Sequence, residues 1–214
     1  MSIRDVPSSG RRLSREERRR QLLEVARDIV RSEGNEALTL GYLAQRAGVS
    51  KPIPYDHFGS RTGLLAALYR AYDDRQNARM AEALAAAPPE LESQAAVIAD
   101  SYVACVVTQG SEIPGVSAAL AGSAELEAIR LSYESGFMER VRTALARFSP
   151  TGEIALPALR SILGAAEALS FAAVRNEISQ DEATSELSAL ICDTVRRAPD
   201  DPRQQSVTTA RSRL

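Results

Sequence analysis

The side chains with the clearest chemical use lie between residues 39 and 61, where polar and basic groups stand among short apolar repeats. Thr39 precedes a stretch of helical periodicity, so its hydroxyl and the free backbone N–H groups behind it suit a phosphate oxygen. Lys51 can donate to guanine O6 or N7, and Pro52 and Ile53 can contact a thymine methyl group. Recognition of double-stranded DNA requires both kinds of contact, to phosphates for position and to base edges for sequence.

Neighbouring residues complete the candidate DNA interface. Gly41 and Tyr42 join the base-reading group, although a glycine offers no side-chain hydrogen bond, and the charge of Arg61 suits a phosphate. The whole set is Thr39, Gly41, Tyr42, Ser50, Lys51, Pro52, Ile53, Tyr55, His57 and Arg61. For His57, the single histidine of the chain, a solvated imidazole without a DNA partner is the alternative.

An arginine-rich stretch precedes this region. It can follow the DNA backbone or minor groove as an arm, or form a solvated charged run. Its members are Arg11, Arg12, Arg15, Arg18, Arg19 and Arg20. Residues 1–61 carry 12 basic and 8 acidic side chains, whereas the remainder carries 14 basic and 20 acidic ones. This uneven spread suits a protein whose N-terminal part meets phosphates.

The residue types do not favour catalysis. Two cysteines, Cys105 and Cys192, have no metal-ligand spacing and are expected to be small buried thiols. The chain contains no H-E-x-x-H, G-x-S-x-G, P-loop or G-x-G-x-x-G motif. We therefore predict that the protein is not an enzyme and that it needs no metal or cofactor.

Two short helices are predicted to position the candidate DNA contacts. Leu40, Leu43 and Ala44 follow the one-faced helical pattern, and Gly48 lies where that helix ends. Ser50 can cap a second helix, which Lys51-Pro52 opens because a proline's missing N–H costs nothing in the first turn. A helix, a tight turn containing glycine and a second helix form the helix-turn-helix of DNA-binding proteins.

The string GVSKPIPYDHFGSRTGLLAAL, from Gly48 to Leu68, resembles the N-terminal domain of the TetR family of bacterial one-component regulators. The resemblance covers roughly residues 14–70. It implies that Tyr55 and His57 contact mainly the DNA backbone. It also implies fewer base contacts at Gly41, where many relatives carry a side chain. Pro54 departs from the family pattern, and a proline at that depth is expected to bend the helix start or delay it.

The rest of the chain is predicted to be helical. Ser14 and Glu17 form a capping box for a first helix that ends at Gly34, and Ser60 caps a long fourth helix that stops at Pro88-Pro89. Further helices are expected over 91–107, 116–121, 124–148, 154–176 and 182–196, with breaks that include Gly110. No segment alternates with a period of two, so we predict an all-α fold of about nine helices.

These elements define a domain layout. We predict a disordered arm over 1–13, a helix-turn-helix DNA-binding domain over 14–60 with its motif at 39–58, a helical regulatory and dimerisation domain over 61–197, and a disordered tail over 198–214. The N-terminus is polar and no apolar run approaches the roughly 20 residues that span a bilayer. We expect a cytoplasmic protein without a membrane partner.

The resemblance also implies an effector pocket between helices four to eight. Its candidate lining residues are Tyr69, Tyr72, Tyr102, Cys105, Val106, Leu120, Tyr133, Phe137, Glu167 and Phe171. Such stripes also fill ordinary protein cores, and that alternative stays open. Because few buried charges are evident, a small and mostly apolar effector is favoured.

Dimerisation is implied by the same resemblance, through a four-helix bundle of the last two long helices. The segment from Leu156 to Val174 is rich in small residues, which let helices approach closely. The predicted interface is Leu159, Ile162, Leu163, Ala166, Leu169, Leu187, Leu190 and Ile191. A helix buried within one subunit is the alternative reading.

These observations support one functional hypothesis and one rival. The first is a homodimeric repressor that binds a palindromic operator and is released by a small-molecule effector. The rival is a helical DNA-binding protein without small-molecule control. The effector, the operator and the regulated genes are not encoded in any motif that we recognise.

Overall fold

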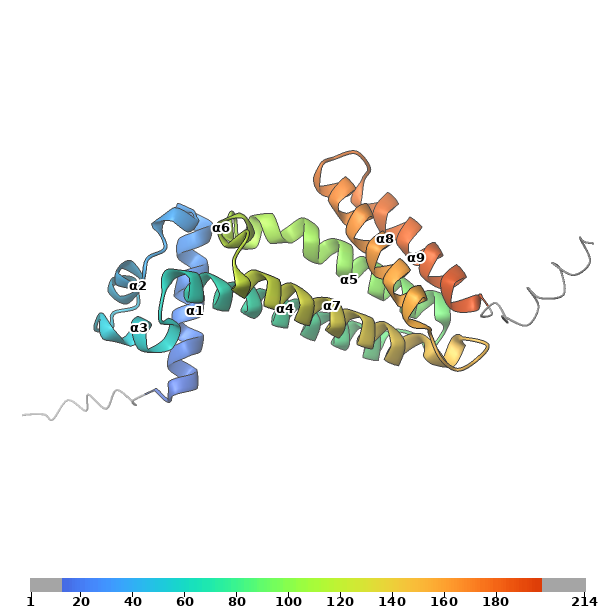
Figure 1. The fold of residues 1–214 in the computed structure, drawn as a ribbon, viewed down its shortest axis with the longest axis horizontal. Coiled ribbons are helices and arrows are strands. Elements are labelled where there is room, and N and C mark those ends of the chain that lie inside the picture. The colour runs from blue at the N-terminus through green and yellow to red at the C-terminus, as the bar shows by residue number, and fades with distance from the viewer. Residues whose placement is uncertain (1–12, 198–214) are drawn as a thin grey trace, which may run out of the picture. The chain divides into compact units, whose positions relative to one another are not determined.

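A computed structural model describes residues 13–197 of the chain (Figure 1). Over that range the backbone forms nine α-helices and two short 3-10 helices, and no strand. The all-α fold predicted from the periodicity is confirmed. The predicted arm, apart from Leu13, and the predicted tail lie outside the described residues.

The described chain divides into two compact units. Unit 1 combines the residues up to Ala71 with the segment Ile113–Ala121, and unit 2 combines Tyr72–Glu112 with the residues from Gly122 onward. The division differs from the predicted boundary at residue 60, because it falls inside helix α4 (Arg61–Ala86). The first turns of α4 bury Leu64, Leu65 and Leu68 completely, which explains why they belong with unit 1.

Unit 1 begins with helix α1 (Arg15–Glu33), whose start has the predicted capping box. The Ser14 hydroxyl accepts a hydrogen bond from the Glu17 backbone, and the Glu17 carboxylate accepts one from the Ser14 backbone. Gly34 ends the helix with φ of 84°, a conformation that favours glycine. Leu22, Ala26, Ile29 and Val30 form the buried stripe.

Helices α2 (Leu40–Arg46) and α3 (Pro52–Phe58) follow the 3-10 turn η1 (Asn35–Ala37). Thr39 caps α2, since its hydroxyl accepts from the backbone of Tyr42 at 3.1 Å. Gly48 turns the chain with φ of 65°. The helix-turn-helix predicted from the sequence is therefore present. Helix α6 (Val116–Leu120) also belongs to unit 1, with Val116 and Leu120 buried.

Unit 2 contains the end of α4 and four long helices: α5 (Leu91–Glu112), α7 (Ala124–Leu145), α8 (Leu156–Val174) and α9 (Gln180–Arg196). A 3-10 turn, η2 (Ala146–Phe148), follows α7. Helix α5 packs against α7, α8 and α9, and one apolar core runs through these helices. The expected break at Gly110 is wrong, because α5 continues through that residue to Glu112.

Helix α8 is unusual in its apolar length. It is the one helix among residues 13–197 that is long and apolar enough to cross a membrane by length and composition alone. Only 33% of its most apolar window is buried within the chain, and Leu156, Phe171 and Val174 are exposed. The helix thus has one face in the core of unit 2 and a second apolar face outside it.

Candidate nucleic-acid interface and ligand groove

The exposed surface of α3 carries most of the predicted DNA contacts. Lys51, Pro52 and Tyr55 are exposed, and the Tyr55 side chain keeps 53% of its surface accessible. Pro54 points inward and is buried. It is the third residue of α3, where a backbone N–H has no helical partner to lose, and α3 begins at Pro52, one residue later than a cap at Ser50 predicts. Ser50 does not cap α3, because Lys51 occupies the cap position without a side-chain bond.

His57 and Phe58 end α3 against helix α1. Arg19 donates to the His57 carbonyl at 3.1 Å, and its guanidinium lies 4.9 Å from the centre of the Phe58 ring. Burial, with help from Arg15 and Arg19, lowers the pKa of His57 below its usual 6.5. The imidazole is therefore mostly neutral at pH 7 in the DNA-free protein. Arg19 itself holds α3 in place.

Tyr42 is held by a polar cluster at the end of α1. Its hydroxyl donates to Glu33 at 2.9 Å and accepts from Arg46 at 3.0 Å, and Arg46 also pairs with Glu33. Gly41 and Thr39 lie beside it at the start of α2, where Thr39 is exposed. A base contact by Tyr42 therefore requires its ring edge, since the hydroxyl is already bonded.

Arg61 occupies a structural position that the sequence did not indicate. Its guanidinium donates to the Leu38 carbonyl at 3.0 Å and to the Asn35 carbonyl and side chain at 2.7 and 3.2 Å. These bonds tie the start of α4 to turn η1. Arg61 is thus a clamp within unit 1, and its contact with a DNA phosphate stays a prediction. Sequence reasoning missed Asp56 and Gln45, two exposed polar residues on α3 and α2.

Several predicted effector residues instead pack against one another in unit 2. The ring centres of Tyr102 and Phe137 are 4.8 Å apart, and those of Tyr102 and Tyr133 are 6.4 Å apart. The Tyr133 hydroxyl lies 3.8 Å from Sγ of Cys105, whose pKa burial raises to about 11. The alternative reading, that these stripes are ordinary core, describes this cluster.

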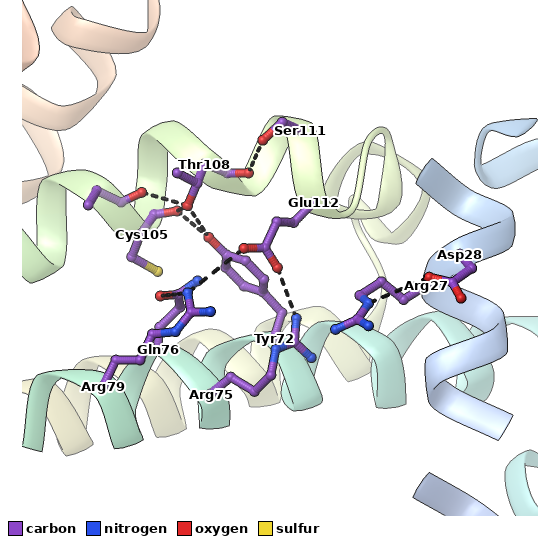
Figure 2. A network of polar contacts seen from close by, with 11 residues as sticks. Arg27, Asp28, Tyr72, Arg75, Gln76, Arg79, Cys105, Thr108, Ser111 and Glu112 are labelled. Carbon is purple, nitrogen blue, oxygen red and sulfur yellow. Dashed lines mark hydrogen bonds and ion pairs between the residues drawn. The ribbon is translucent and has the colours of Figure 1, made fainter. Parts of the chain in front are cut away.

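Tyr72 joins the same region through its hydroxyl (Figure 2). It donates to the Cys105 carbonyl and lies 3.0 Å from the Thr108 hydroxyl, which ties α4 to α5. Figure 2 shows the Arg75 and Arg79 side chains reaching from α4 toward Glu112, and both pair with its carboxylate. Burial raises the pKa of Tyr72, so its hydroxyl stays neutral.

Other predicted effector residues lie on several different helices. Leu120 lies in helix α6, within unit 1, and Tyr69 also falls on the unit 1 part of α4. Phe171 is 52% exposed on α8. Val106 and Glu167 are half-buried on α5 and α8. That the whole set lines one effector pocket stays a prediction.

A groove does exist in unit 2, at the far end of α4. It has a volume of about 690 Å³ and lies between α4, the start of α5 and α7. Ala81, Leu84 and Ala85 line it from α4. Gly136 and Arg140 line it from α7, and the sequence analysis named neither. Gly136 follows Tyr133 by three residues and Arg140 follows Phe137 by three, and this helical spacing in α7 could have indicated them.

The region beside this groove contains buried charge, contrary to the expectation. Asp73 is 7% exposed, and burial followed by the charge of Asp74 raises its pKa to about 7. Arg140 opposes that shift, and burial lowers the pKa of Arg140 itself. The prediction of a small, mostly apolar effector rested on the apparent scarcity of buried charges, and that premise is wrong.

The predicted dimer contacts are mostly inside the chain. Leu159, Ile162, Leu163, Ala166, Leu187 and Ile191 all belong to the buried core of unit 2. Only Leu169 and Leu190 remain half-exposed. We correct the predicted dimer interface, because these apolar side chains of α8 and α9 pack in the core that the two helices share with α5. The opposite side of α8 is left as its free face.

Comparison with known proteins identifies the N-terminal region first. Residues 22–68 match the family model described as bacterial regulatory proteins, tetR family. Over 66 residues the chain is 47% identical to the HTH-type transcriptional activator FasR of Mycolicibacterium smegmatis. That match spans 30% of this chain and 30% of the relative.

Solved structures resemble a larger part of the chain. A TetR-family transcriptional regulator from Rhodococcus sp. is 25% identical with a TM-score of 0.61, over 84% of this chain and 98% of its own. A TetR/AcrR-family regulator from Thermobifida fusca is also 25% identical with a TM-score of 0.61, over 84% of this chain and 99% of its own. The helix-turn-helix and these matches show that residues 22–68 form a DNA-binding domain of the TetR family, and the helical fold of the chain is that of TetR-family transcriptional regulators.

Proposed function

We propose that this transcriptional regulator binds an inverted-repeat operator as a homodimer and is controlled by a small molecule bound in unit 2. The observation that carries the DNA part is the exposed surface of α3. Lys51, Pro52 and Tyr55 project from a helix that the Arg19 contacts and the buried Phe58 hold rigidly. A recognition helix needs this combination of exposed polar groups and a fixed axis to enter the major groove.

The proposed contacts divide by role. Lys51, Pro52 and Ile53 read base edges, together with the ring edge of Tyr42. Thr39, Tyr55 and His57 contact phosphates, while Ser50 and Gly41 allow close approach of the backbone. Arg15 and Arg18 line a shallow groove beside Ile53 and His57, which adds positive charge next to α3. The arm residues that precede them lie outside the described chain.

Dimerisation is proposed through the free face of α8. Ser161, Gly164, Ala168 and Phe171 recur every three or four residues and are all exposed. A side chain added at Gly164 would meet no described atom within 4 Å. Small residues followed by an exposed aromatic ring form a surface that a second copy of α8 can approach closely.

A pair of substitutions tests this interface. Ala168→Glu places a charge on the free face of α8 and is expected to yield monomers in analytical ultracentrifugation. Ala128→Glu, on the exposed side of α7, is the matched control and should leave the dimer intact. A wild-type protein that sediments as a monomer at micromolar concentration would contradict the proposal.

Effector control is proposed through helix α4, which is continuous from Arg61 to Ala86. Its last turns line the groove, and its first turn is clamped to turn η1 by Arg61. A molecule that binds the groove shifts the protein only if it prefers the form that does not fit DNA. We propose release from the operator, hence repression. FasR is described as an activator, so the sign must be measured.

Operator selection tests the proposed function as a whole. The protein is incubated with random duplexes, and the bound fraction is sequenced and footprinted. We expect an inverted repeat whose half-sites lie roughly 10 bp or more apart, because two symmetric recognition helices must meet the same side of the duplex. Selection of single, unrepeated sites would contradict binding as a dimer. A DNA affinity that no groove ligand changes would favour the alternative, a DNA-binding protein without small-molecule control.

A DNA-binding regulator of this kind acts in the cytoplasm.

A further inference from the structure

Helix α7 supplies the groove with an arginine whose hydrogen-bond donors the protein does not satisfy. Nε and Nη2 of Arg140 are shielded from solvent, yet they donate to no other residue between 13 and 197. A buried guanidinium is normally matched by carboxylates or carbonyls, since an unsatisfied donor loses its hydration without compensation. Arg140 is therefore suited to an acceptor that comes from outside the chain.

Asp73 does not supply that acceptor. The two residues influence each other's charge, but no ion pair within 4.0 Å links them in the described chain. The Asp73 carboxyl, whose pKa burial raises to about 7, is only about half ionised at pH 7. Glu139 also lines the groove, but its carboxylate pairs with Arg142. The positive charge of Arg140 is thus not cancelled by a neighbouring carboxylate.

Gly136 makes room beside the guanidinium. A Cβ at this position would lie 3.5 Å from Nη1 and 3.6 Å from Nη2 of Arg140, so the guanidinium lies over the glycine. Glycine is unfavourable inside a helix, and Gly136 stands in the middle of α7. Both residues line the groove. The missing side chain leaves space in which the flexible arginine can turn its donors toward a bound molecule.

The opposite wall of the groove is apolar. Ala81, Leu84 and Ala85 lie along one side of α4, and Pro89 continues that wall beyond the helix. Gln94 offers no free donor here, because its amide nitrogen lies within hydrogen-bond distance of the carbonyls of Leu84, Ala87 and Pro88. Two cations, Arg140 and Arg147, and a wall of small aliphatic groups within about 690 Å³ define the complementary molecule, and the Arg147 guanidinium lies over the Phe148 ring.

We propose that the groove binds a small carboxylate with an apolar body. Its two oxygens accept hydrogen bonds from Arg140, a geometry that the planar guanidinium favours. Its apolar body lies along Ala81, Leu84 and Ala85. This inference rests on the proposed effector role of the groove, and it adds an anionic head group to the small, mostly apolar effector that the sequence favours.

Three probes of one length separate the head group from the chain. Octanoate, octan-1-ol and octylamine are titrated into the full-length protein without DNA, and binding is followed by calorimetry. We expect octanoate to bind about tenfold tighter than octanol or more, as charge-assisted hydrogen bonds require. Octylamine should bind most weakly of the three. A wild-type protein that binds all three alike, or none of them, overturns the proposal.

Substitutions in α7 test which residue causes the preference for octanoate. Arg140→Met keeps the aliphatic volume and should abolish the preference for octanoate while octanol binding remains. Gly136→Ala keeps the charge, favours the helix and should weaken octanoate binding by filling the space beside the guanidinium. Arg130→Met, at an exposed arginine of the same helix, is the matched control and should change nothing. If the preference survives in Arg140→Met, the anchor is wrong.

The same measurements separate this inference from the proposed function. Octanoate that binds through Arg140 but leaves operator affinity unchanged supports the carboxylate site and contradicts its use as an effector site. If the protein binds its operator but does not prefer octanoate over octanol, the carboxylate site is contradicted and the proposed DNA-binding function is not. Arg140→Met is checked by thermal denaturation and by operator binding, so a folding defect is not mistaken for loss of the anchor.

Discussion

At the scale of single residues, Asp73 couples folding to pH. Burial raises the pKa of its carboxyl from 3.8 to about 7, and Asp74, Arg140, Tyr133 and Cys105 are the ionisable groups that interact with it. The folded state therefore binds the proton more tightly than the unfolded chain does. Unfolding releases a proton between about pH 4 and 7, so the free energy of unfolding falls as pH rises through that window.

Asp73→Asn should remove this dependence. A shift of about three pKa units corresponds to a loss on the order of 4 kcal/mol across the window, at roughly 1.4 kcal/mol per unit. The amide cannot ionise, so the variant should be more stable than wild type at pH 7 and above. Urea denaturation between pH 4 and 8 measures the effect, with the exposed Asp100→Asn as control. Equal slopes in wild type and Asp73→Asn would refute the assignment.

Lys51 and Thr39 should differ in what their removal does to DNA binding. On the proposal that Lys51 reads a base, Lys51→Ala is expected to cost about 1–3 kcal/mol and to relax preference at one base pair. Thr39→Ala should weaken all sequences alike. Since the Thr39 hydroxyl also caps α2, Thr39→Ser serves as the control that keeps the cap. Binding assays on a set of single-base operator variants decide between the roles. A uniform loss in Lys51→Ala would mean that this lysine contacts only phosphate.

At the scale of elements, the clamp between α4 and η1 is the contact to test. Arg61→Met removes three hydrogen bonds to Asn35 and Leu38, and should lower the free energy of unfolding of unit 1 by about 1–2 kcal/mol. The estimate is kept low because the side chain is 37% exposed and partly screened. Thermal denaturation followed by circular dichroism measures it, with Arg31→Met on the exposed side of α1 as control. An unchanged transition combined with a flatter salt dependence of DNA binding would restore the phosphate role of Arg61.

At the scale of the whole molecule, the effector and the operator are coupled through their binding affinities. If a groove ligand weakens operator binding, operator DNA must weaken ligand binding by the same factor, typically a coupling of about 1–3 kcal/mol. Octanoate affinity measured with and without saturating operator tests this reciprocity. Equal octanoate affinities in the two titrations would exclude control through this site. The protein would then be a DNA-binding regulator that the carboxylate does not switch.

Local signals in the sequence were enough to predict where several helices begin and end. The Ser14 capping box, the Thr39 cap and the Gly34 and Gly48 ends are built from residues within four positions of each other, so their structures follow from short-range chemistry. The same holds for the exposed face of α3. Gly110 shows the limit, because packing of α5 against its neighbours outweighs the local preference of one glycine to end a helix.

Sequence by itself determined that this chain is a helical DNA-binding regulator, since a helix-turn-helix is encoded by residues that are close together. Only the tertiary structure decided the partners of long-range groups. Arg61 and Asn35 lie 26 positions apart, and Gly136 and Arg140 face Ala81 across the groove from another helix. Periodicity shows that a helix has an apolar face, but not which helix covers it. For that reason the predicted dimer contacts proved to be core, and the arginine of the ligand groove went unrecognised.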